Sequence, residues 1–468
     1  MNLPDRLRQL LGADAVLDDP ARIAPLLVDH RQLYQGAAAA VVQPHDTAGV
    51  ATLLAFCNAE GIGVVPQGGN TSYCGGATPD ESGRQVLLSM HRLNRIRSVD
   101  AAGFSMIAEA GCLLAQVQQA AAGAQRLFPL SLGSEGSCQI GGNLATNAGG
   151  TAVLRYGMAR DLVLGLEVVL ADGSLLSTLS PLRKDNTGYD LKGLFVGSEG
   201  TLGIITAACL KLFPAPCAVA TAWVSLPEPA AALALLGQLR EASGDRVSSC
   251  ELVPQVALDL VLGLIPAARD PGVAHAPWYL LVELTSPAND DLDAVLAAAL
   301  GRAIERGLAT DAVLAASGAQ RDALWLLRES VPAAQRRAGG SLKHDVSVPL
   351  AALPELIEQG GALCRQLAPE GVLVAYGHVG DGNLHFNLSQ REGSDTADFL
   401  ARELPLKRAV HDLVARLGGS FSAEHGVGRL KVGELERYAD PVELQLMRRV
   451  KQALDPRGIL NPGKVLRD

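Results

Sequence analysis

The sequence predicts an α+β protein of two domains, and three of its features support that fold class. Its 468 residues exceed the size at which one hydrophobic core keeps growing. The first half alternates short β-branched runs with glycine-rich turns, and from about residue 215 long Ala- and Leu-rich helices alternate with apolar strands. Since 48% of the residues are hydrophobic, the chain can fill two cores.

The hydrophobic pattern predicts the positions of the main elements. The expected strands are residues 40–42, 63–66, 86–88, 105–109, 164–170, 278–284 and 372–376. The expected helices are residues 47–59, 114–122, 230–241 and 291–306. We therefore expect an N-terminal helical segment, a first domain, a second domain and a C-terminal segment that returns to the first domain, over residues 1–35, 36–215, 216–419 and 420–468.

Charge and hydropathy argue against several kinds of partner. Lys and Arg number 40 against 49 Asp and Glu, and no long basic run is present, so nucleic acid is not an expected partner. No charge-free apolar stretch could span a bilayer, so an integral membrane protein is not expected. Residues 1–11 lack the apolar core of a secretory signal, which predicts a cytoplasmic location. The eight cysteines form no CxxC pair, so any metal must be bound by His and carboxylate.

Glycine is concentrated in three blocks of the first half. Residues 64–72 read as a strand that runs into a turn, whose exposed amides suit a pyrophosphate, although any tight surface turn could look alike. Residues 131–150, SLGSEGSCQIGGNLATNAGG, are so rich in glycine that their ordering costs entropy, which a bound cofactor would offset. In residues 194–205 glycine recurs every three residues before a strand, a spacing that could instead serve close packing.

Together the three blocks resemble the FAD-binding domain of the vanillyl-alcohol oxidase and p-cresol methylhydroxylase (PCMH) flavoprotein superfamily. Their order and content match over residues 36–214, and no GxGxxG of a nicotinamide-binding unit follows the first strand. The resemblance implies a PCMH-type FAD-binding fold with an α+β substrate (cap) domain. Since residues 67–76 contain no histidine, FAD is expected to be non-covalent. The expected FAD contacts are Pro66, Gln67, Gly68, Gly69, Asn70, Thr71, Ser72, Pro129, Gly133, Ser134, Gly141, Gly142, Asn143, Thr146, Asn147, Gly149, Glu199, Gly200, Gly203, Ile205 and Asn461.

Residues 372–388, VLVAYGHVGDGNLHFNL, predict a hairpin with one histidine on each arm. The turn at Asp381 should bring His378 and His385 together, and His385 shares a strand face with Asn387. A lone strand histidine is more often a core residue than a ligand. Two converging histidines favour a metal site.

A third ligand is suggested by the sequence SAEHGVG at residues 422–428. The carboxylate of Glu424 with two imidazoles would give a three-ligand site with an open position, as in catalytic zinc sites. His425 would then stand beside the metal as a general base. In the alternative interpretation, Glu424 merely begins a helix and His425 lies on the surface.

Two cations upstream are candidates for carboxylate recognition. Arg328 in LWLLRESVP offers a planar fork, and Lys343 in SLKHDVSVP offers a point charge. Each alone could be a solvated surface charge. Lys343 is the stronger candidate, because it lies in an apolar, strand-like run where an unpaired charge is costly.

The second half resembles the D-2-hydroxyglutarate dehydrogenase branch, which includes D-lactate dehydrogenases and glycolate oxidase subunits. The resemblance, carried by GHVGDGNLH and AEHG, implies zinc at His378, His385 and Glu424, and His425 as the base. It further implies substrate contacts at Arg328, Lys343 and Asn387. One departure is Pro332, where D-2-hydroxyglutarate enzymes have a threonine that touches the substrate, so the length of the substrate stays open.

The expected activity is therefore FAD- and metal-dependent oxidation of a small anionic D-2-hydroxy acid. D-2-hydroxyglutarate is the leading substrate, and D-lactate or glycolate are alternatives. An electron-transfer flavoprotein or a quinone is the expected acceptor, and a homodimer is left open. Two further hypotheses are a metal-dependent hydrolase, which leaves the glycine blocks unexplained, and a non-catalytic flavin sensor.

Overall fold

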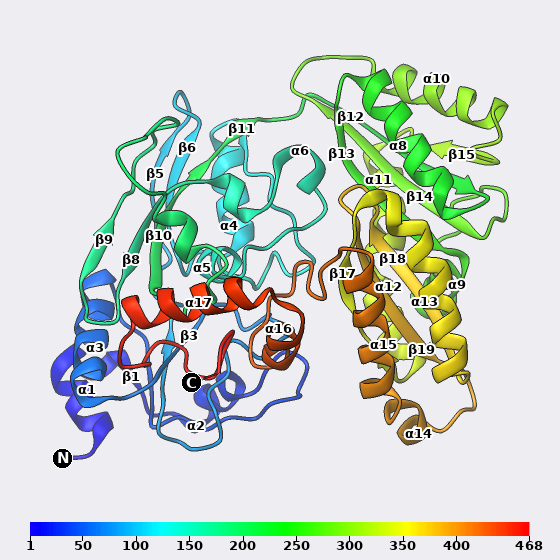
Figure 1. Ribbon diagram of the computed structural model, residues 1–468. Coiled ribbons are helices and arrows are strands. Elements are labelled where there is room, and N and C mark those ends of the chain that lie inside the picture. Colours follow the sequence, from blue (N-terminus) through cyan, green and yellow to red (C-terminus); the bar gives the residue numbers. More distant parts are fainter. Residues whose placement is uncertain (468) are drawn as a thin grey trace. The chain divides into compact units, whose positions relative to one another are not determined.

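The computed structural model describes residues 1–467, which form two compact units, each considered by itself (Figure 1). The first unit contains Met1–Gly150, Gly157–Ala215 and the segment from Glu424 onward. The second contains Thr151–Tyr156 and Pro216–Ala423.

The first unit is built on two main sheets. One has the strand order β1-β2-β4-β3, with β2 and β3 parallel to β4, and the other has the antiparallel order β5-β6-β10-β8-β9, while β7 and β11 form a separate pair. Its strands are β1 Val16–Leu17, β2 Ala40–Val42, β3 Val64–Gln67, β4 Val86–Ser89, β5 Ile96–Asp100, β6 Ser105–Glu109, β7 Arg126–Leu127, β8 Val163–Val169, β9 Leu175–Ser177, β10 Ile204–Lys211 and β11 Phe213–Pro214.

The helices of the first unit follow the caps that the sequence supplies. In α3 the side chain of Asp46 accepts from the nitrogen of Gly49, and Gly61 ends the helix at φ 67°. The helices are α1 Leu3–Leu11, α2 Pro20–Ile23, α3 Thr47–Glu60, α4 Leu114–Gly123, α5 Ile140–Ala145, α7 Lys192–Phe195, α16 Val432–Tyr438 and α17 Pro441–Leu454. Three short 3-10 turns are Ala13–Ala15, Ala24–Leu27 and Ala159–Leu162.

The C-terminal segment is part of the first unit. Ile459 and Leu460 are buried in the same core as Val64 and Leu88 of the first sheet. Val64 of β3 donates to the carbonyl of Ile459 at 2.7 Å and accepts from the nitrogen of Asn461 at 2.8 Å, so the tail extends the sheet edge. In Figure 1 the red helix α17 accordingly lies among blue to green elements.

The second unit is one long antiparallel sheet covered by helices. Its strand order is β15-β12-β14-β13-β18-β19-β16, with β17 also paired to β19. The strands are β12 Ala218–Leu226, β13 Val247–Pro254, β14 Trp278–Ser286, β15 Asp311–Leu314, β16 Ser341–Leu342, β17 Asp345–Ser347, β18 Gly371–His378 and β19 Asn383–Gln390. The helices are α6 Val153–Tyr156, α8 Pro229–Ser243, α9 Gln255–Leu264, α10 Leu292–Glu305, α11 Gly318–Glu329, α12 Val331–Ala338, α13 Leu353–Leu367, α14 Thr396–Leu400 and α15 Glu403–Arg416, with a 3-10 turn at Leu350–Ala352.

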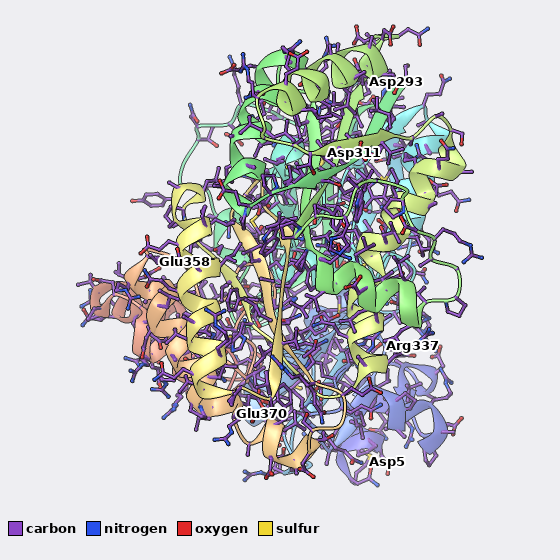
Figure 2. The ribbon with its side chains drawn as sticks, turned by 90° about the vertical axis from the view of Figure 1, so that its right-hand side faces the viewer. Asp5, Asp293, Asp311, Arg337, Glu358 and Glu370 are labelled. Atoms are coloured by element: carbon purple, nitrogen blue, oxygen red, sulfur yellow. The ribbon has the colours of Figure 1, made fainter. Side chains whose placement is uncertain are left out.

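Helices α10 and α13 show how this sheet is covered. Asp293 and Glu358 are exposed on these helices (Figure 2), whereas Leu296 and Leu356 of the same helices are buried in the core of the second unit. This amphipathic division explains why residues 291–306 could be recognised as a helix from sequence.

The predicted strands and helices agree with the structure to within two residues at each end. The exception is the strand-like run at 341–349. It is interrupted at Lys343 and His344, which separate β16 from β17. Among residues 1–467, no helix combines the length and apolar character that a membrane crossing requires.

Candidate active site

The first two glycine blocks lie against each other in the first unit. A Cβ on Gly69 would lie 2.0 Å from the carbonyl oxygen of Ser137, and one on Gly68 would lie 3.6 Å from the nitrogen of Gly142. Only glycine allows the first approach. At Gly142 itself a Cβ would meet no atom within 4 Å, so the block keeps an open side.

The residues beside this open side fit a dinucleotide. Within residues 1–467, the Oε1 atoms of Gln67 and Gln139 are buried and have no hydrogen-bond partner. Gly133 and Gly136 also leave open space where a Cβ would stand. Unpartnered buried acceptors and open glycine backbone are what a bound FAD would cover, so the two blocks can hold the cofactor.

Other predicted cofactor residues order the loops. The side-chain amide of Asn70 donates to the carbonyl of Val28 at 2.8 Å, and Ser72 Oγ accepts from the nitrogen of Cys74 at 3.3 Å. Thr146 Oγ1 donates to Gly142 and Asn147 Oδ1 accepts from the nitrogen of Arg160. The remaining predicted FAD contacts in and beside these two blocks all lie in the first unit and are Pro66, Thr71, Pro129, Ser134, Gly141, Asn143 and Gly149.

The third block is packed onto the first. A Cβ on Gly200 would lie 2.5 Å from Cγ of Pro66, and a Cβ on Gly203 would lie 2.6 Å from Val168 Cγ1. Ile205 is buried in β10. Asn461 Nδ2 donates to the carbonyl oxygens of Gly76 and Glu199, at 2.9 and 2.7 Å. Asn461 therefore joins the loop that follows the first block, the third block and the C-terminal segment.

The predicted histidine hairpin is present in the second unit. Strands β18 and β19 pair antiparallel, with Tyr376 opposite His385. The ring centroids of His378 and His385 are 5.6 Å apart. Nδ1 of His385 lies 4.0 Å from Oδ1 of Asp345 on the neighbouring strand β17. The two imidazoles and this carboxylate gather at one end of the hairpin.

A buried carboxylate links His378 to Arg328. Oε1 of Glu251 lies 2.7 Å from Nδ1 of His378, and Oε2 accepts from Nε of Arg328 at 2.8 Å. Burial acts to raise the pKa of Glu251, but the charges of His378 and Arg328 and their hydrogen bonds lower it below its ordinary value. The side chain of Arg328 is 7% exposed, so this cation is not the surface charge of the alternative interpretation.

Asn387 and the neighbourhood of Lys343 are joined by hydrogen bonds. Oδ1 of Asn387 accepts from the backbone nitrogen of His344 at 3.2 Å, and Nδ2 donates to Oε1 of Gln335 at 3.0 Å. The amide thereby fixes the backbone next to Lys343, which is partly buried. Substrate contact by Asn387 and Lys343 stays a prediction.

The loop that carries Glu424 and His425 is fastened within the first unit. The carboxylate of Glu199 accepts from the backbone nitrogens of Val427 and Gly428, at 2.6 and 2.8 Å. Full burial raises the pKa of Glu199, although these two hydrogen bonds and the charge of Lys431 act in the opposite direction. Its side chain is directed at this loop, and its predicted contact with FAD stays a prediction.

An aromatic ring orients the predicted base. Tyr73, directly after the first glycine block, stacks on His425 with centroids 4.6 Å apart and an angle of 28° between the planes. Nε2 of His425 lies 3.7 Å from Oε1 of Glu424, and both side chains are partly exposed. His425 is therefore accessible, as a base must be.

Sequence reasoning missed Tyr73, Glu251 and Asp345. A carboxylate in the apolar run around Glu251 was a usable signal, because an unpaired charge there would be costly. Tyr73 follows the glycine block, and Asp345 lies in the run that contains Lys343. Nothing in the local sequence marks either residue as part of a site.

Two family profiles cover most of the chain. "FAD binding domain" matches residues 38–179, and "FAD linked oxidases, C-terminal domain" matches residues 215–465, more than half of the chain. The chain belongs to the FAD-linked oxidases. The expectation of an FAD-dependent oxidoreductase is thus confirmed, which overturns the hydrolase and sensor alternatives.

Curated relatives of this FAD-linked oxidase are named D-2-hydroxyglutarate dehydrogenases. The Bos taurus protein is 40% identical over 457 residues, covering 96% of this chain and 81% of its own length. The Arabidopsis thaliana protein is 36% identical over 461 residues, covering 98% and 80%. Both are named mitochondrial, as are the Oryza sativa and Rattus norvegicus relatives, so the prediction of a cytoplasmic location is wrong.

The solved structure of p-cresol methylhydroxylase with substrate bound has the same fold. It aligns with a TM-score of 0.78 at 18% identity, covering 99% of this FAD-linked oxidase and 96% of its own chain. At this identity the likeness concerns the fold alone. The predicted PCMH-type fold with an α+β second domain is confirmed.

Proposed function

We propose that the protein oxidises a D-2-hydroxy acid to the 2-oxo acid, with D-2-hydroxyglutarate as the leading substrate. The observation that carries the proposal is the buried pair of Arg328 and Glu251 beside His378. This pair places the Arg328 cation, which can bind an anionic substrate, near the His378 imidazole, which can bind a metal. The names of the curated relatives support the choice of substrate.

As metal ligands we propose His378, His385 and Glu424, with zinc as the ion. Two imidazoles and one carboxylate match the donors of catalytic zinc sites and leave a position for substrate. Nδ1 of His378 lies 2.7 Å from Oε1 of Glu251, so Nε2 is the nitrogen that would bind metal. When bound, the ion would supply the positive charge that lowers the pKa of the substrate hydroxyl.

His425 takes the hydroxyl proton on an imidazole nitrogen. Arg328, assisted by Lys343 and Asn387, binds substrate carboxylate and sets the orientation of the Cα–H bond. A bound FAD would supply the two-electron acceptor for the hydride that leaves Cα, at its N5. As the hydroxyl loses its proton and Cα its hydride, the carbonyl of the 2-oxo acid forms.

Pro332 bears on the length of the substrate. It stands in the first turn of α12, where a missing amide hydrogen costs no helical hydrogen bond. It offers no hydroxyl to a distal carboxylate. This feature favours D-lactate or glycolate as the second candidate substrate.

An anaerobic screen tests the substrate. Flavin bleaching is followed with D- and L-2-hydroxy acids of increasing length, before and after removal of metal by a chelator and addition of zinc. We expect bleaching by D-2-hydroxyglutarate, and no response to L-acids. Bleaching by D-lactate or glycolate alone would assign the second candidate, and no bleaching by any 2-hydroxy acid would overturn the proposal.

The reduced enzyme needs an acceptor, for which we propose an electron-transfer flavoprotein. Reoxidation rates with that protein and with a quinone analogue decide between these two acceptors.

We propose further that FAD is non-covalent, because residues 67–76 contain no histidine. Acid precipitation should then leave all flavin in the supernatant. Light scattering would decide whether the protein is a homodimer, which the sequence leaves open.

A further inference from the structure

Glu251 is a carboxylate in the interior of the second unit. It lies in β13, every residue of which is buried, and its side chain is 1% exposed. The strand pairing places it opposite His378 on one side and Leu281 on the other. An ionised carboxylate in such a position is strongly destabilising unless its partners compensate for the lost water.

Each carboxylate oxygen of Glu251 contacts a different residue of the proposed active site. One oxygen faces His378 Nδ1 and the other accepts from Arg328 Nε. No other described residue hydrogen-bonds to this carboxylate. Its described hydrogen bonds are therefore confined to these two side chains.

The contact with His378 determines which ring nitrogen can bind a metal. A carboxylate next to Nδ1 keeps the proton on that nitrogen and leaves the lone pair on Nε2. The same contact fixes the rotation of the ring. Without Glu251 the imidazole would lose this constraint on its tautomer and its rotation.

The contact with Arg328 fixes the plane of the guanidinium. Its Cζ lies 4.8 Å from the centroid of the Tyr376 ring, so the group is held by Glu251 at Nε and by the ring on one face. The two terminal nitrogens of Arg328 make no hydrogen bond to any residue from 1 to 467. This edge is the one that binds a carboxylate bidentately.

We propose that Glu251 is a positioning residue that orients both the metal ligand His378 and the substrate-binding Arg328. The inference rests on the proposed function. It means that metal affinity and substrate affinity depend on one buried carboxylate that touches neither. Loss of Glu251 should therefore weaken both together.

The test is Glu251→Gln, which keeps the shape of the side chain. The side-chain oxygen of glutamine can accept from only one of the two donors, His378 Nδ1 and Arg328 Nε. The NH₂ group of glutamine would then face the other donor, to which it cannot hydrogen-bond. We expect zinc affinity, measured by chelator competition without substrate, to fall about 10- to 100-fold. We expect KM for the 2-hydroxy acid to rise about 10-fold, and Glu251→Asp to recover part of both losses.

Glu283→Gln is the matched control. Glu283 lies in β14 of the same sheet and accepts from Thr221 Oγ1 and Trp325 Nε1, both at 2.9 Å. Its change should leave zinc affinity and KM within about two-fold of wild type. FAD content and circular dichroism check that each variant folds. If Glu251→Gln does not fold, the same measurements are made on Glu251→Asp.

The outcomes separate this inference from the proposed function. Wild-type zinc affinity and KM in the Glu251 variants would overturn the positioning role while leaving the function intact. Equal losses in the Glu283 control would also overturn it, since the effect would then be one of sheet stability. A wild-type protein that binds no zinc and oxidises no 2-hydroxy acid would overturn the proposed function and the inference with it.

Discussion

The rings of Tyr73 and His425 are stacked 4.6 Å apart, although they come from opposite ends of the chain. Tyr73 belongs to the loop after β3, and His425 to the loop that returns to the first unit. The stack limits the rotation of the imidazole. The loop that continues from the first glycine block thus also orients the proposed base.

Replacing Tyr73 tests this relationship. Tyr73→Phe keeps the ring and should reduce flavin at nearly the wild-type rate. Tyr73→Ala removes a ring pair that typically contributes about 0.5–1.5 kcal/mol, so flavin reduction should slow by roughly 3- to 10-fold. Stopped-flow measurement under anaerobic conditions compares the two. Equal rates in both variants would mean that stacking does not orient His425.

The role of His425 is tested by His425→Ala. FAD and metal should stay bound, while anaerobic flavin reduction slows by about 100-fold or more because the hydroxyl proton has no acceptor. His91→Ala, which removes an exposed histidine of the same unit, serves as the control. An unchanged rate in His425→Ala would refute its assignment as the base.

Removing metal should stop the reaction without removing the flavin. After chelation we expect flavin reduction to fall at least about 10-fold and zinc to restore it, because the hydroxyl loses its source of positive charge. In His378→Ala zinc should no longer restore the rate. The exposed His275 of the second unit supplies the control, as His275→Ala should respond like wild type. Full activity in chelated protein would exclude a catalytic metal.

Glu199→Ala should loosen the loop of His425. The change leaves the backbone nitrogens of Val427 and Gly428 without their acceptor, at a cost of about 1–3 kcal/mol. We expect a lower melting temperature together with a lower kcat. Glu60→Ala, at an exposed ion pair with Arg6, should change neither by a comparable amount. A normal kcat in Glu199→Ala would show that the loop keeps its geometry unaided.

Sequence predicted the parts of the site that depend on neighbours in the chain. The hairpin of His378 and His385 follows from two apolar runs around a tight turn, and the structure places the rings 5.6 Å apart. The partners of Glu251 could not be found in this way, because His378 and Arg328 lie 127 and 77 residues from it. Its role depends on the order of strands in the sheet, which hydrophobic periodicity does not specify.

The third glycine block shows the same limit. The resemblance to the flavoprotein superfamily implies that its glycines contact the cofactor, whereas their spacing also suits close packing. The structure gives Gly200 and Gly203 close packing against Pro66 and Val168. Both explanations produce the same sequence. Only the position of the neighbouring chain distinguishes them.

The pairing of Val64 with Leu460 has a consequence for biosynthesis. On the ribosome, β3 emerges long before the segment that pairs with its outer edge. The backbone hydrogen-bonding groups at this edge of the first unit therefore stay unpaired while the second unit is synthesised. Nascent chains arrested before residue 459 should therefore engage chaperones, and their proteolytic resistance in the first unit should appear only when the tail is released.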